Sequence, residues 1–175
     1  MENIYRKIFS SRCSVFGDSL LRIFLEAAKS VGISPAKARA IVEDLGIECF
    51  DLDNLAPERE EYSEGERARL FEAAFKVSNE ILGEGGEMGM MRIIADSLRE
   101  IPDAIEKIRE FFSPIVDLEI EEHPDKLVVK ARPKGELLED DVPYPAKIIA
   151  FARCGKLRII SKRREGDRIV VEFAL

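Results

Sequence analysis

The residue best suited to acid–base chemistry is His123, the only histidine of the chain. Histidine is the side chain most often used as a general base near neutral pH, and it is also a common metal ligand. It stands here between Glu122 and Pro124, in a sequence typical of a turn, where side chains face solvent. We therefore predict a solvated turn residue, and a single histidine excludes a multi-histidine metal site.

Three cysteines, Cys13, Cys49 and Cys154, could act as nucleophiles or metal ligands. Zinc knuckles and redox pairs need a Cys-x-x-Cys or Cys-x-x-His spacing, and the sequence has neither. An odd number of cysteines without a secretion signal also argues against a disulfide framework. The three thiols are predicted to be inert and to pack as small apolar side chains.

The glycine-rich segment 83–89, GEGGEMG, could cradle a phosphate with backbone amides. Met88 stands where a dinucleotide-binding loop needs its third glycine, and the lysine of a P-loop is missing. We therefore predict a corner between helices. Two acidic clusters could bind hard cations: Glu58, Glu60 and Glu61, and Glu139, Asp140 and Asp141. Both lack the alternating ligand spacing of a calcium loop. We therefore predict that their carboxylates are solvated.

Methionine and phenylalanine residues could line an adaptable apolar pocket, because methionine side chains adjust to irregular ligands. The alternative interpretation is ordinary core, where such residues are usually buried. The predicted pocket residues are Phe71, Phe75, Met88, Met91 and Phe111.

The elements that must position these residues follow from hydrophobic spacing, which predicts an α+β fold: about five N-terminal helices followed by a β-β-α-β-β antiparallel unit. Ser34 and Pro35 predict the start of the second helix, after one that begins near Asp18 or Ser19. Ser63 and Glu66 form the pattern of a capping box, which opens a helix to about Leu82. Two further helices are predicted over 90–98 and 102–112.

After residue 114 the period of the apolar residues changes from helical to alternating, which predicts a hairpin of strands 115–121 and 126–132. A second hairpin joins LRIIS to RIVVEF through KRREGD. Both a helix and a strand fit 145–155, and we favour a helix. These elements predict one domain over residues 1–175, with a helical part at about 1–113 and the β-β-α-β-β part at about 114–175.

Composition narrows the class of protein. With 46% hydrophobic residues, a chain of 175 residues can bury enough surface to fold without metal or disulfides. No apolar run reaches the roughly 20 residues that cross a bilayer, and no signal peptide is evident, which predicts a cytoplasmic protein without a membrane span. The absence of Gln and Thr beside 35% charged residues is typical of a thermophile.

The net charge of −7 is distributed unevenly along the chain. Residues 1–40 carry 7 Lys and Arg against 3 Asp and Glu, residues 41–125 carry 8 against 24, and residues 126–175 carry 12 against 7. An acidic middle thus lies between two mildly basic ends. The ends could contact acidic partners such as nucleic acid, whereas the middle could not.

The segment VGISPAKARAIVEDLGIECFDLDNL resembles a helix-hairpin-helix element, in which a Gly-apolar-Gly hairpin offers backbone amides to a nucleic-acid phosphate. Gly32 and Ile33 match its first two positions, and Ser34 takes the place of the second glycine. The same residues, at about 19–46, can be interpreted as a helix-turn-helix element or as simple helix packing. The predicted contacts are Ser34, Lys37 and Arg39 with Lys162, Arg163 and Arg164, and further Lys156, Arg158 and Arg168.

The whole layout is similar to the vinyl-reductase-type domains, which belong with the haem-nitric-oxide-binding domains and certain vesicle-trafficking subunits. Gly166 and Asp167 followed by Phe173 resemble the Gly-Asp-x-x-Cys-x-Phe ending of those domains. Haem-binding members carry a histidine on the helix before the first strand, and residues 102–112 contain none, so the resemblance does not imply haem. It implies a domain that holds a small hydrophobic molecule between helices and sheet, or that dimerises through its helices.

These observations predict a non-enzymatic, cytoplasmic ligand-sensing or adaptor protein without a cofactor, and a homodimer. Its partner would be a small apolar molecule or a protein. The alternative is a nucleic-acid-binding regulator that uses the element at 19–46, and a third possibility is a structural subunit of a larger complex.

Overall fold

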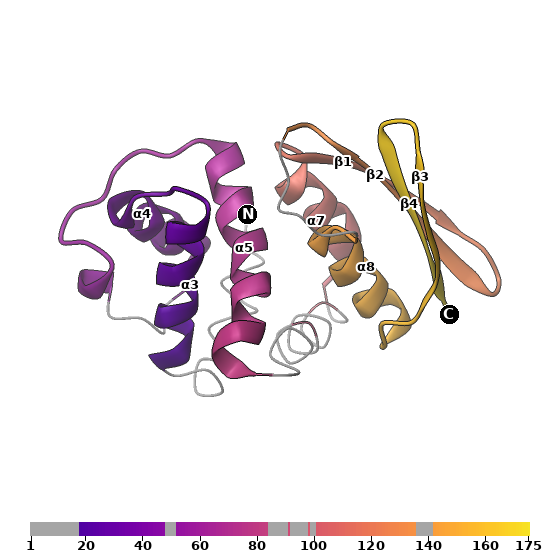
Figure 1. Ribbon diagram of the computed structural model, residues 1–175, viewed down its shortest axis with the longest axis horizontal. Coiled ribbons are helices and arrows are strands. Elements are labelled where there is room, and N and C mark those ends of the chain that lie inside the picture. The colour runs from indigo at the N-terminus through magenta and orange to yellow at the C-terminus, as the bar shows by residue number, and fades with distance from the viewer. Residues whose placement is uncertain (1–17, 48–51, 84–90, 92–97, 99–100, 136–141) are drawn as a thin grey trace. The chain divides into compact units, whose positions relative to one another are not determined.

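The computed structural model describes residues 18–47, 52–83, 91, 98, 101–135 and 142–175, which Figure 1 draws as a ribbon. Its internal contacts divide the chain into two compact units, residues 1–93 and residues 94–175. We call them unit 1 and unit 2 and describe each by itself.

The first described element of unit 1 is helix α3, Asp18–Ser30, whose apolar residues recur at helical spacing and which packs against helix α5, Glu64–Leu82. Leu20, Ile23, Phe24 and Ala27 of α3 are fully buried. The chain turns at Gly32, which has a φ of 70° that favours glycine. The next helix then starts within three residues.

Helix α4, Pro35–Leu45, starts at the predicted residue. The Ser34 hydroxyl accepts a hydrogen bond from the Lys37 amide at 3.2 Å, and Pro35 occupies a position whose amide would have no partner within the helix. Gly46 ends the helix in the left-handed conformation at φ 72°. One face of α4 packs inward through Ala38, Ile41, Val42 and Leu45.

An irregular connection with a short 3-10 helix, η1 (Leu52–Asn54), leads from α4 to α5. The capping box predicted at the start of α5 is confirmed. The Ser63 hydroxyl accepts from the Glu66 amide at 3.1 Å, and the Glu66 carboxylate accepts from the Ser63 amide at 3.0 Å. Two backbone amides that the helix leaves without partners are thereby satisfied.

Unit 2 contains helices α7, Ala104–Phe112, and α8, Tyr144–Cys154, with one antiparallel sheet. The strands are β1, Val116–Glu122; β2, Lys126–Pro133; β3, Ile159–Glu165; and β4, Arg168–Ala174. Their order across the sheet is β1-β2-β4-β3, so that β1 and β3 are the two edges.

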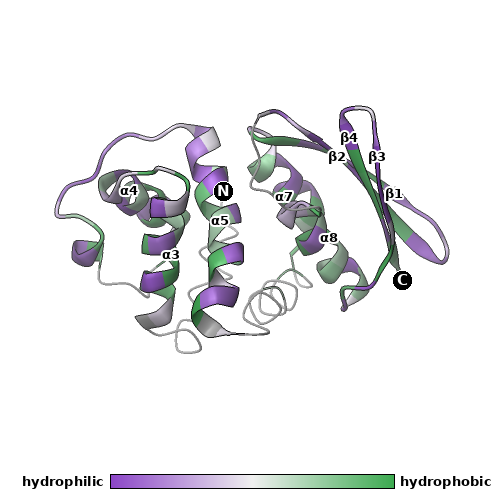
Figure 2. Ribbon diagram, viewed as in Figure 1, coloured by the Kyte–Doolittle hydropathy of each residue, from purple (hydrophilic) through white to green (hydrophobic). Residues whose placement is uncertain are grey.

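The register gives the sheet one apolar face and one charged face. Leu118 lies opposite Ala131, Val129 opposite Val171, and Leu127 opposite Phe173. Helix α7 packs on β1, and α8 packs on β2 and β4. Figure 2 shows the alternation of apolar and polar residues along these strands.

The other face carries ion pairs between neighbouring strands, among them Lys126–Glu172 at 2.7 Å and Lys130–Glu121 at 2.6 Å. Arg132 also pairs with Asp167, just before β4, at 3.0 Å. Hydrogen bonds from Lys126 and from Ser161 lower the pKa of the Glu172 carboxyl to about 2. The face is thus charged but internally compensated.

The predicted α+β class is confirmed, with a four-stranded antiparallel sheet, and the helix favoured over 145–155 is confirmed as α8. Of the helix predicted over 90–98 only Met91 and Leu98 are described, and both are helical. The single domain stays a prediction. The boundary between the two units lies between residues 93 and 94, so α7 belongs to the same unit as α8 and β1, on which it packs.

The second hairpin differs from the prediction in its turn. Lys162, Arg163 and Arg164, expected in the connection, lie within β3, where Arg163 pairs with Val170. The turn is the two residues Gly166 and Asp167, and Gly166 has a φ of 63°. A two-residue hairpin turn needs a residue that tolerates positive φ, so Gly166 determines where β3 ends and the turn begins.

Candidate ligand-binding site

A pocket lies in unit 2 between the first turn of α7 and the last turn of α8. Helix α7 begins directly after Pro102 and Asp103, and α8 ends where Gly155 takes the left-handed conformation at φ 71° and donates its amide to the Phe151 carbonyl. These two helix ends bring residues 103–106 and residues 152 and 153 to one place.

The cavity has a volume of about 360 Å³. At about 30 Å³ for each water-sized group, it has room for roughly a dozen non-hydrogen atoms. Its walls are mainly aliphatic, with three charged residues among them. The lining residues are Leu98, Ile101, Asp103, Ala104, Ile105, Glu106, Ala152 and Arg153. An aliphatic wall with a few polar groups is typical of small-molecule sites.

Two of the three charged lining residues have partners of opposite charge. The Arg153 guanidinium lies 2.7 Å from the Glu122 carboxylate, and the Glu106 carboxylate lies 3.3 Å from Arg109 one helical turn later. The Asp103 carboxylate has no ion pair or hydrogen bond with any described residue, and it does not cap α7. One negative charge next to an aliphatic cavity is therefore left uncompensated.

Asp103 also has an unusual backbone. Its φ of 57° is the only positive φ among the described residues other than glycine. Aspartate and asparagine tolerate this region better than most side chains, but the conformation still has a cost. Residues held in such conformations are concentrated at binding and active sites, and this one lines the cavity.

Cys154 ends α8 next to the lining residue Arg153 and is half-buried, without a disulfide. Burial raises the pKa of its thiol above the ordinary value, against the smaller opposite effect of Arg153 and Lys156. A raised pKa lowers the thiolate fraction and hence the reactivity. This agrees with the inert thiol that the sequence predicts; Cys13 and Cys49 lie outside the described residues.

Of the five residues predicted to line a pocket, the four that the structure describes do not line this cavity. Phe71 and Phe75 are buried on α5, with their rings edge to face at 5.4 Å, and Met91 is buried as well. Phe111 belongs to unit 2, where its ring lies edge to face with that of Phe112. Met88 lies outside the described residues. Of the predicted pocket residues, the structure thus shows Phe71 and Phe75 in contact with each other.

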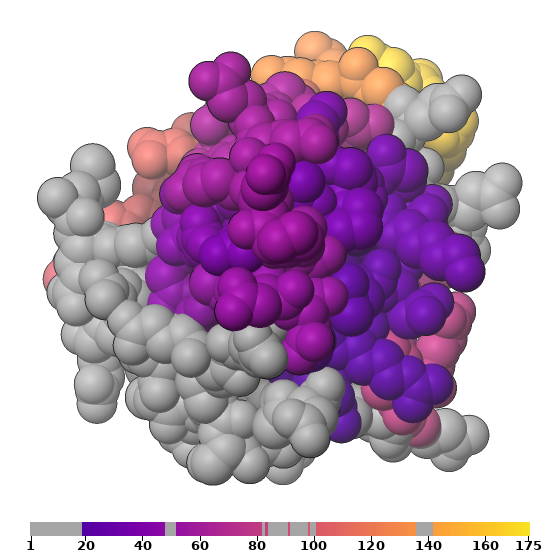
Figure 3. All heavy atoms as spheres, turned by 90° about the vertical axis from the view of Figure 1, so that its left-hand side faces the viewer, coloured from indigo at the N-terminus to yellow at the C-terminus, as the bar shows by residue number. Residues whose placement is uncertain are grey.

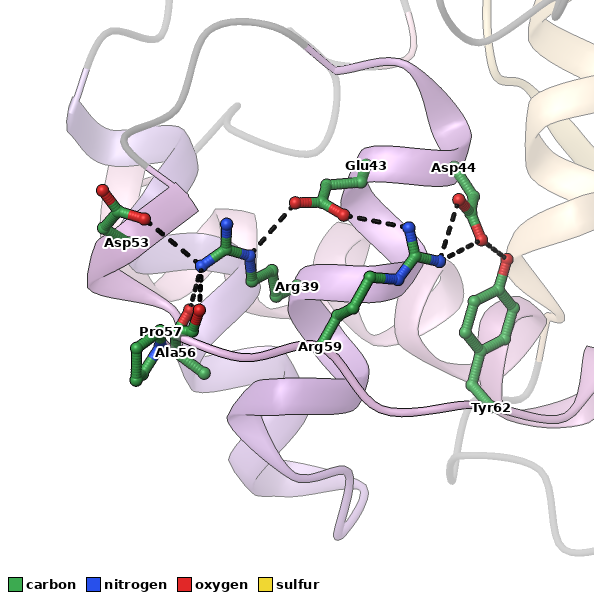
Figure 4. Close-up of polar contacts among 8 residues, drawn as sticks. All are labelled: Arg39, Glu43, Asp44, Asp53, Ala56, Pro57, Arg59 and Tyr62. Carbon is green, nitrogen blue, oxygen red and sulfur yellow. Dashed lines mark hydrogen bonds and ion pairs between the residues drawn. The ribbon is translucent and has the colours of Figure 1, made fainter.

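The predicted nucleic-acid contacts on α4 all take part in contacts within unit 1. Ser34 caps the helix, and Lys37 lies 3.0 Å from the Glu66 carboxylate of α5. The Arg39 side chain is 18% exposed and binds Glu43 at 3.1 Å and Asp53 at 3.2 Å. It also donates to the carbonyls of Ala56 and Pro57 (Figure 4). These contacts tie the connection after η1 to α4, and Figure 3 shows both at the surface.

A second arginine extends the same network toward α5. Arg59 binds Glu43 and Asp44, each at 3.1 Å, and the Tyr62 hydroxyl donates to Asp44 at 2.6 Å. Figure 4 shows the row from Asp53 to Tyr62. Partial burial and the hydrogen bond to the Asp44 carboxylate raise the pKa of Tyr62 to about 12.

The titration of Tyr62 tests this network. The free phenol of tyrosine titrates near pH 10, so the contribution of Tyr62 to stability is complete below pH 10 and is lost as the pH rises toward 12. In a spectrophotometric titration we expect one phenol with a midpoint near 12. Tyr62→Phe should remove that phase, Asp44→Asn should move it toward 10, and Tyr144→Phe should leave it in place. A phase that survives Tyr62→Phe would contradict the assignment.

His123 lies in the β1–β2 turn, as predicted, exposed and 3.6 Å from the Glu121 carboxylate. Glu58, Glu60 and Glu61 are exposed, also as predicted, whereas residues 84–89 and 139–141 lie outside the described chain. Within the described residues, no group of three or more His, Cys, Asp or Glu side chains is placed to hold a metal ion.

Two features were missed at the sequence level. Glu72 is a carboxylate that is almost fully buried on α5; it falls on the stripe of Ala68 and Phe75, and that spacing could have revealed it. The sequence predicts Asp103 only as part of the helix over 102–112, because a positive φ at an aspartate after Pro102 leaves no signal in the sequence. The backbone angle is visible only in the structure.

No protein-family model matches the chain, and no curated protein sequence matches it. Gly166, Asp167 and Phe173, which carry the resemblance to vinyl-reductase-type domains, lie in the β3–β4 turn and in β4. That resemblance stays a prediction, as do the cytoplasmic location, the hot habitat and the homodimer. None of the described helices combines the length and the apolar character needed to cross a membrane.

Proposed function

We propose that the protein is a non-enzymatic ligand-sensing or adaptor protein, and that its α7–α8 pocket binds a small molecule with an aliphatic body and a protonated amine. The observation that carries this proposal is the Asp103 carboxylate, which has no described partner beside an aliphatic cavity of about 360 Å³. The other charges of the lining are compensated by Glu122 and Arg109. A cationic ligand would neutralise the charge of Asp103, whereas an anionic ligand would add a second negative charge beside it.

The position of the pocket supports a sensing role. Its walls come from the ends of two helices, and both helices pack on the sheet, α7 on β1 and α8 on β2 and β4. A ligand that contacts both helix ends favours the arrangement in which the ends are close together. Such a ligand shifts a population of helix arrangements by its differential affinity, and a protein partner can recognise the result.

The nucleic-acid alternative receives less support from the geometry. Binding to phosphates depends on cations that can leave their protein partners for the nucleic acid. Lys37 and Arg39 are instead held by carboxylates of α4, α5 and the connection between them. Ser34 uses its hydroxyl to cap α4.

Isothermal titration with three matched probes, octylamine, 1-octanol and octanoate, tests the proposal. We expect octylamine to bind most tightly and octanoate most weakly. Asp103→Asn should weaken octylamine binding about fivefold, the value for an exposed charge pair worth about 1 kcal/mol, and should leave octanol binding unchanged. Asparagine is the suitable replacement, because it also tolerates a positive φ.

Two further variants give the control and the contradiction. Glu110→Gln removes one acid from the far end of α7, outside the lining, and should change none of the three affinities. Ala152→Phe places a ring in the cavity and should abolish binding of octylamine and octanol. The proposal fails if the wild-type chain binds none of the probes, or if octylamine binds equally well to the Ala152→Phe variant.

A further inference from the structure

Strand β3 is an edge of the described sheet, β1-β2-β4-β3, so one side of its backbone pairs with β4 and no strand of the described residues lies beside the other. None of its seven residues is buried, and six are exposed. An edge strand with unpaired amides and carbonyls is a template for a further strand. The mode of recognition that uses it is strand addition.

Two large apolar side chains are exposed at the start of this edge. Ile159 is 42% exposed and Ile160 is 55% exposed. Soluble proteins protect their edges with charges and bulges, and β3 has a bulge between Ile159 and Ser161. Exposed isoleucines instead favour association with a partner strand, because they add apolar area that this strand can cover. The edge therefore combines backbone groups for pairing with side chains for contact.

The charges of this edge have predominantly one sign. Lys162, Arg163 and Arg164 follow one another in β3, and Lys156 and Arg158 precede it. The register places Lys162 and Arg164 on the helix side of the sheet, opposite Val171 and Ile169. A row of cations attracts a strand of negative charge and repels another copy of β3.

Arg163 differs from its neighbours because it points to the opposite face. It lies 2.7 Å from Glu165 and 3.6 Å from Glu172. It therefore belongs to the set of ion pairs on the charged face. Arg164 has no ion pair with any described residue, which leaves its guanidinium for an incoming carboxylate.

A second copy of the chain fits this edge less well than a separate acidic segment. The opposite edge, β1, carries Asp117, Glu119, Glu121 and Glu122. These acids are already paired: Asp117 with Lys134, Glu119 with Lys130 and Arg168, Glu121 with Lys130, and Glu122 with Arg153. Pairing β3 with β1 of another copy would compete with these contacts.

Single-stranded nucleic acid is also a weaker match. Proteins that bind it over a sheet stack the bases on aromatic side chains. The one aromatic residue in the four strands is Phe173, which is fully buried and lies in register with Leu127 and Ile159. The charged face has acids beside its cations, as in the Lys126–Glu172 pair.

We infer that the β3 edge binds an extended acidic segment of another protein by strand addition, with Lys162 and Arg164 contacting its carboxylates and Ile159 and Ile160 contacting its apolar side chains. This site lies apart from the residues that line the α7–α8 pocket. The two proposals can therefore succeed or fail separately.

Fluorescence anisotropy with labelled seven-residue peptides tests the inference on the full chain. The first peptide alternates glutamate and valine, and the second alternates lysine and valine. We expect the acidic peptide to bind at least tenfold more tightly than the basic one, and to bind more weakly as salt is added. Alternate backbone amides of the acidic peptide would face β3. Methylation of those amides should reduce the affinity of the peptide at least tenfold, because strand addition uses main-chain hydrogen bonds.

The variant Lys162→Glu with Arg164→Glu should reduce binding of the acidic peptide at least tenfold. Its matched control is Arg22→Glu with Lys76→Glu, which makes the same charge change at two exposed residues of unit 1 and should alter binding less than twofold. Far-ultraviolet circular dichroism and the midpoint of thermal unfolding should be unchanged in both double variants. An unchanged midpoint shows that the variants are folded, whether or not the pocket binds octylamine.

Three results would overturn the inference. In one, the acidic peptide binds no better than the basic peptide. In another, both double variants lose the same affinity, which would assign the effect to net charge. In the third, the edge binds oligouridylate, or a second copy of the chain detected by sedimentation, in place of the acidic peptide. The double variant Lys162→Glu with Arg164→Glu would then lose that binding.

Discussion

Phe75→Ala is expected to lower the free energy of unfolding of unit 1 by about 3–5 kcal/mol, the usual cost of removing a fully buried phenylalanine ring. Phe75 has no exposed surface, and its ring meets that of Phe71 edge to face at 5.4 Å. The substitution removes apolar contact and leaves a cavity that neighbouring side chains fill only in part. Chemical denaturation followed by far-ultraviolet circular dichroism measures the effect.

The same variant decides between two interpretations of the methionine and phenylalanine residues. A core residue supports the fold in the absence of any ligand, whereas a residue in the wall of an open pocket has less packing to lose. Phe75→Leu keeps most of the volume and should cost less than about 1.5 kcal/mol. If Phe75→Ala costs no more than Phe75→Leu, the ring is not part of the core and the pocket interpretation gains support.

Arg39→Ala is expected to lower the free energy of unfolding by about 2–3 kcal/mol, because hydrogen bonds to charged groups each contribute about 1.5–3 kcal/mol. The Arg39 side chain is 18% exposed, and its guanidinium joins Glu43, Asp53 and the carbonyls of Ala56 and Pro57. Without it, two carboxylates and two carbonyls lose a donor. Arg39→Lys keeps the charge but not the planar fork, and should have an intermediate effect.

The matched control for this prediction is Arg59→Ala in the same network. Arg59 is 52% exposed and also binds two carboxylates, Glu43 and Asp44. Exposed ion pairs contribute little, so the loss should be below about 1 kcal/mol. Equal effects for the two arginines would contradict the structural role of Arg39. A variant Arg39→Ala that is fully stable but no longer binds duplex DNA at low salt would instead support the nucleic-acid alternative.

Local signals predicted the local structure well. The Ser34 cap with Pro35 and the Ser63–Glu66 capping box act through neighbouring residues, so their effect can be recognised in the sequence. The alternation after Pro114 likewise predicted a strand with one apolar face. The turn of the second hairpin was less well predicted, because six residues, KRREGD, were assigned where two suffice.

The candidate site was not predictable in the same way. The pocket depends on the meeting of residues 103–106 with residues 152 and 153, and nothing in the local sequence indicates that these helix ends meet. The edge position of β3 depends on the strand order, since the same basic residues in a central strand would be paired on both sides. Arg39 is a further example, because its four partners include two backbone carbonyls more than a dozen residues away.

The turn of two residues at Gly166 and Asp167 has a consequence for how this surface could change. Side chains alternate between the faces of a strand, so one inserted residue would move every residue of β3 to the opposite face wherever the turn keeps two residues and the register shifts by one. Lys162 and Arg164 would then exchange sides with Ser161 and Arg163. A single insertion could thus invert the polarity of the edge without altering any residue of the core.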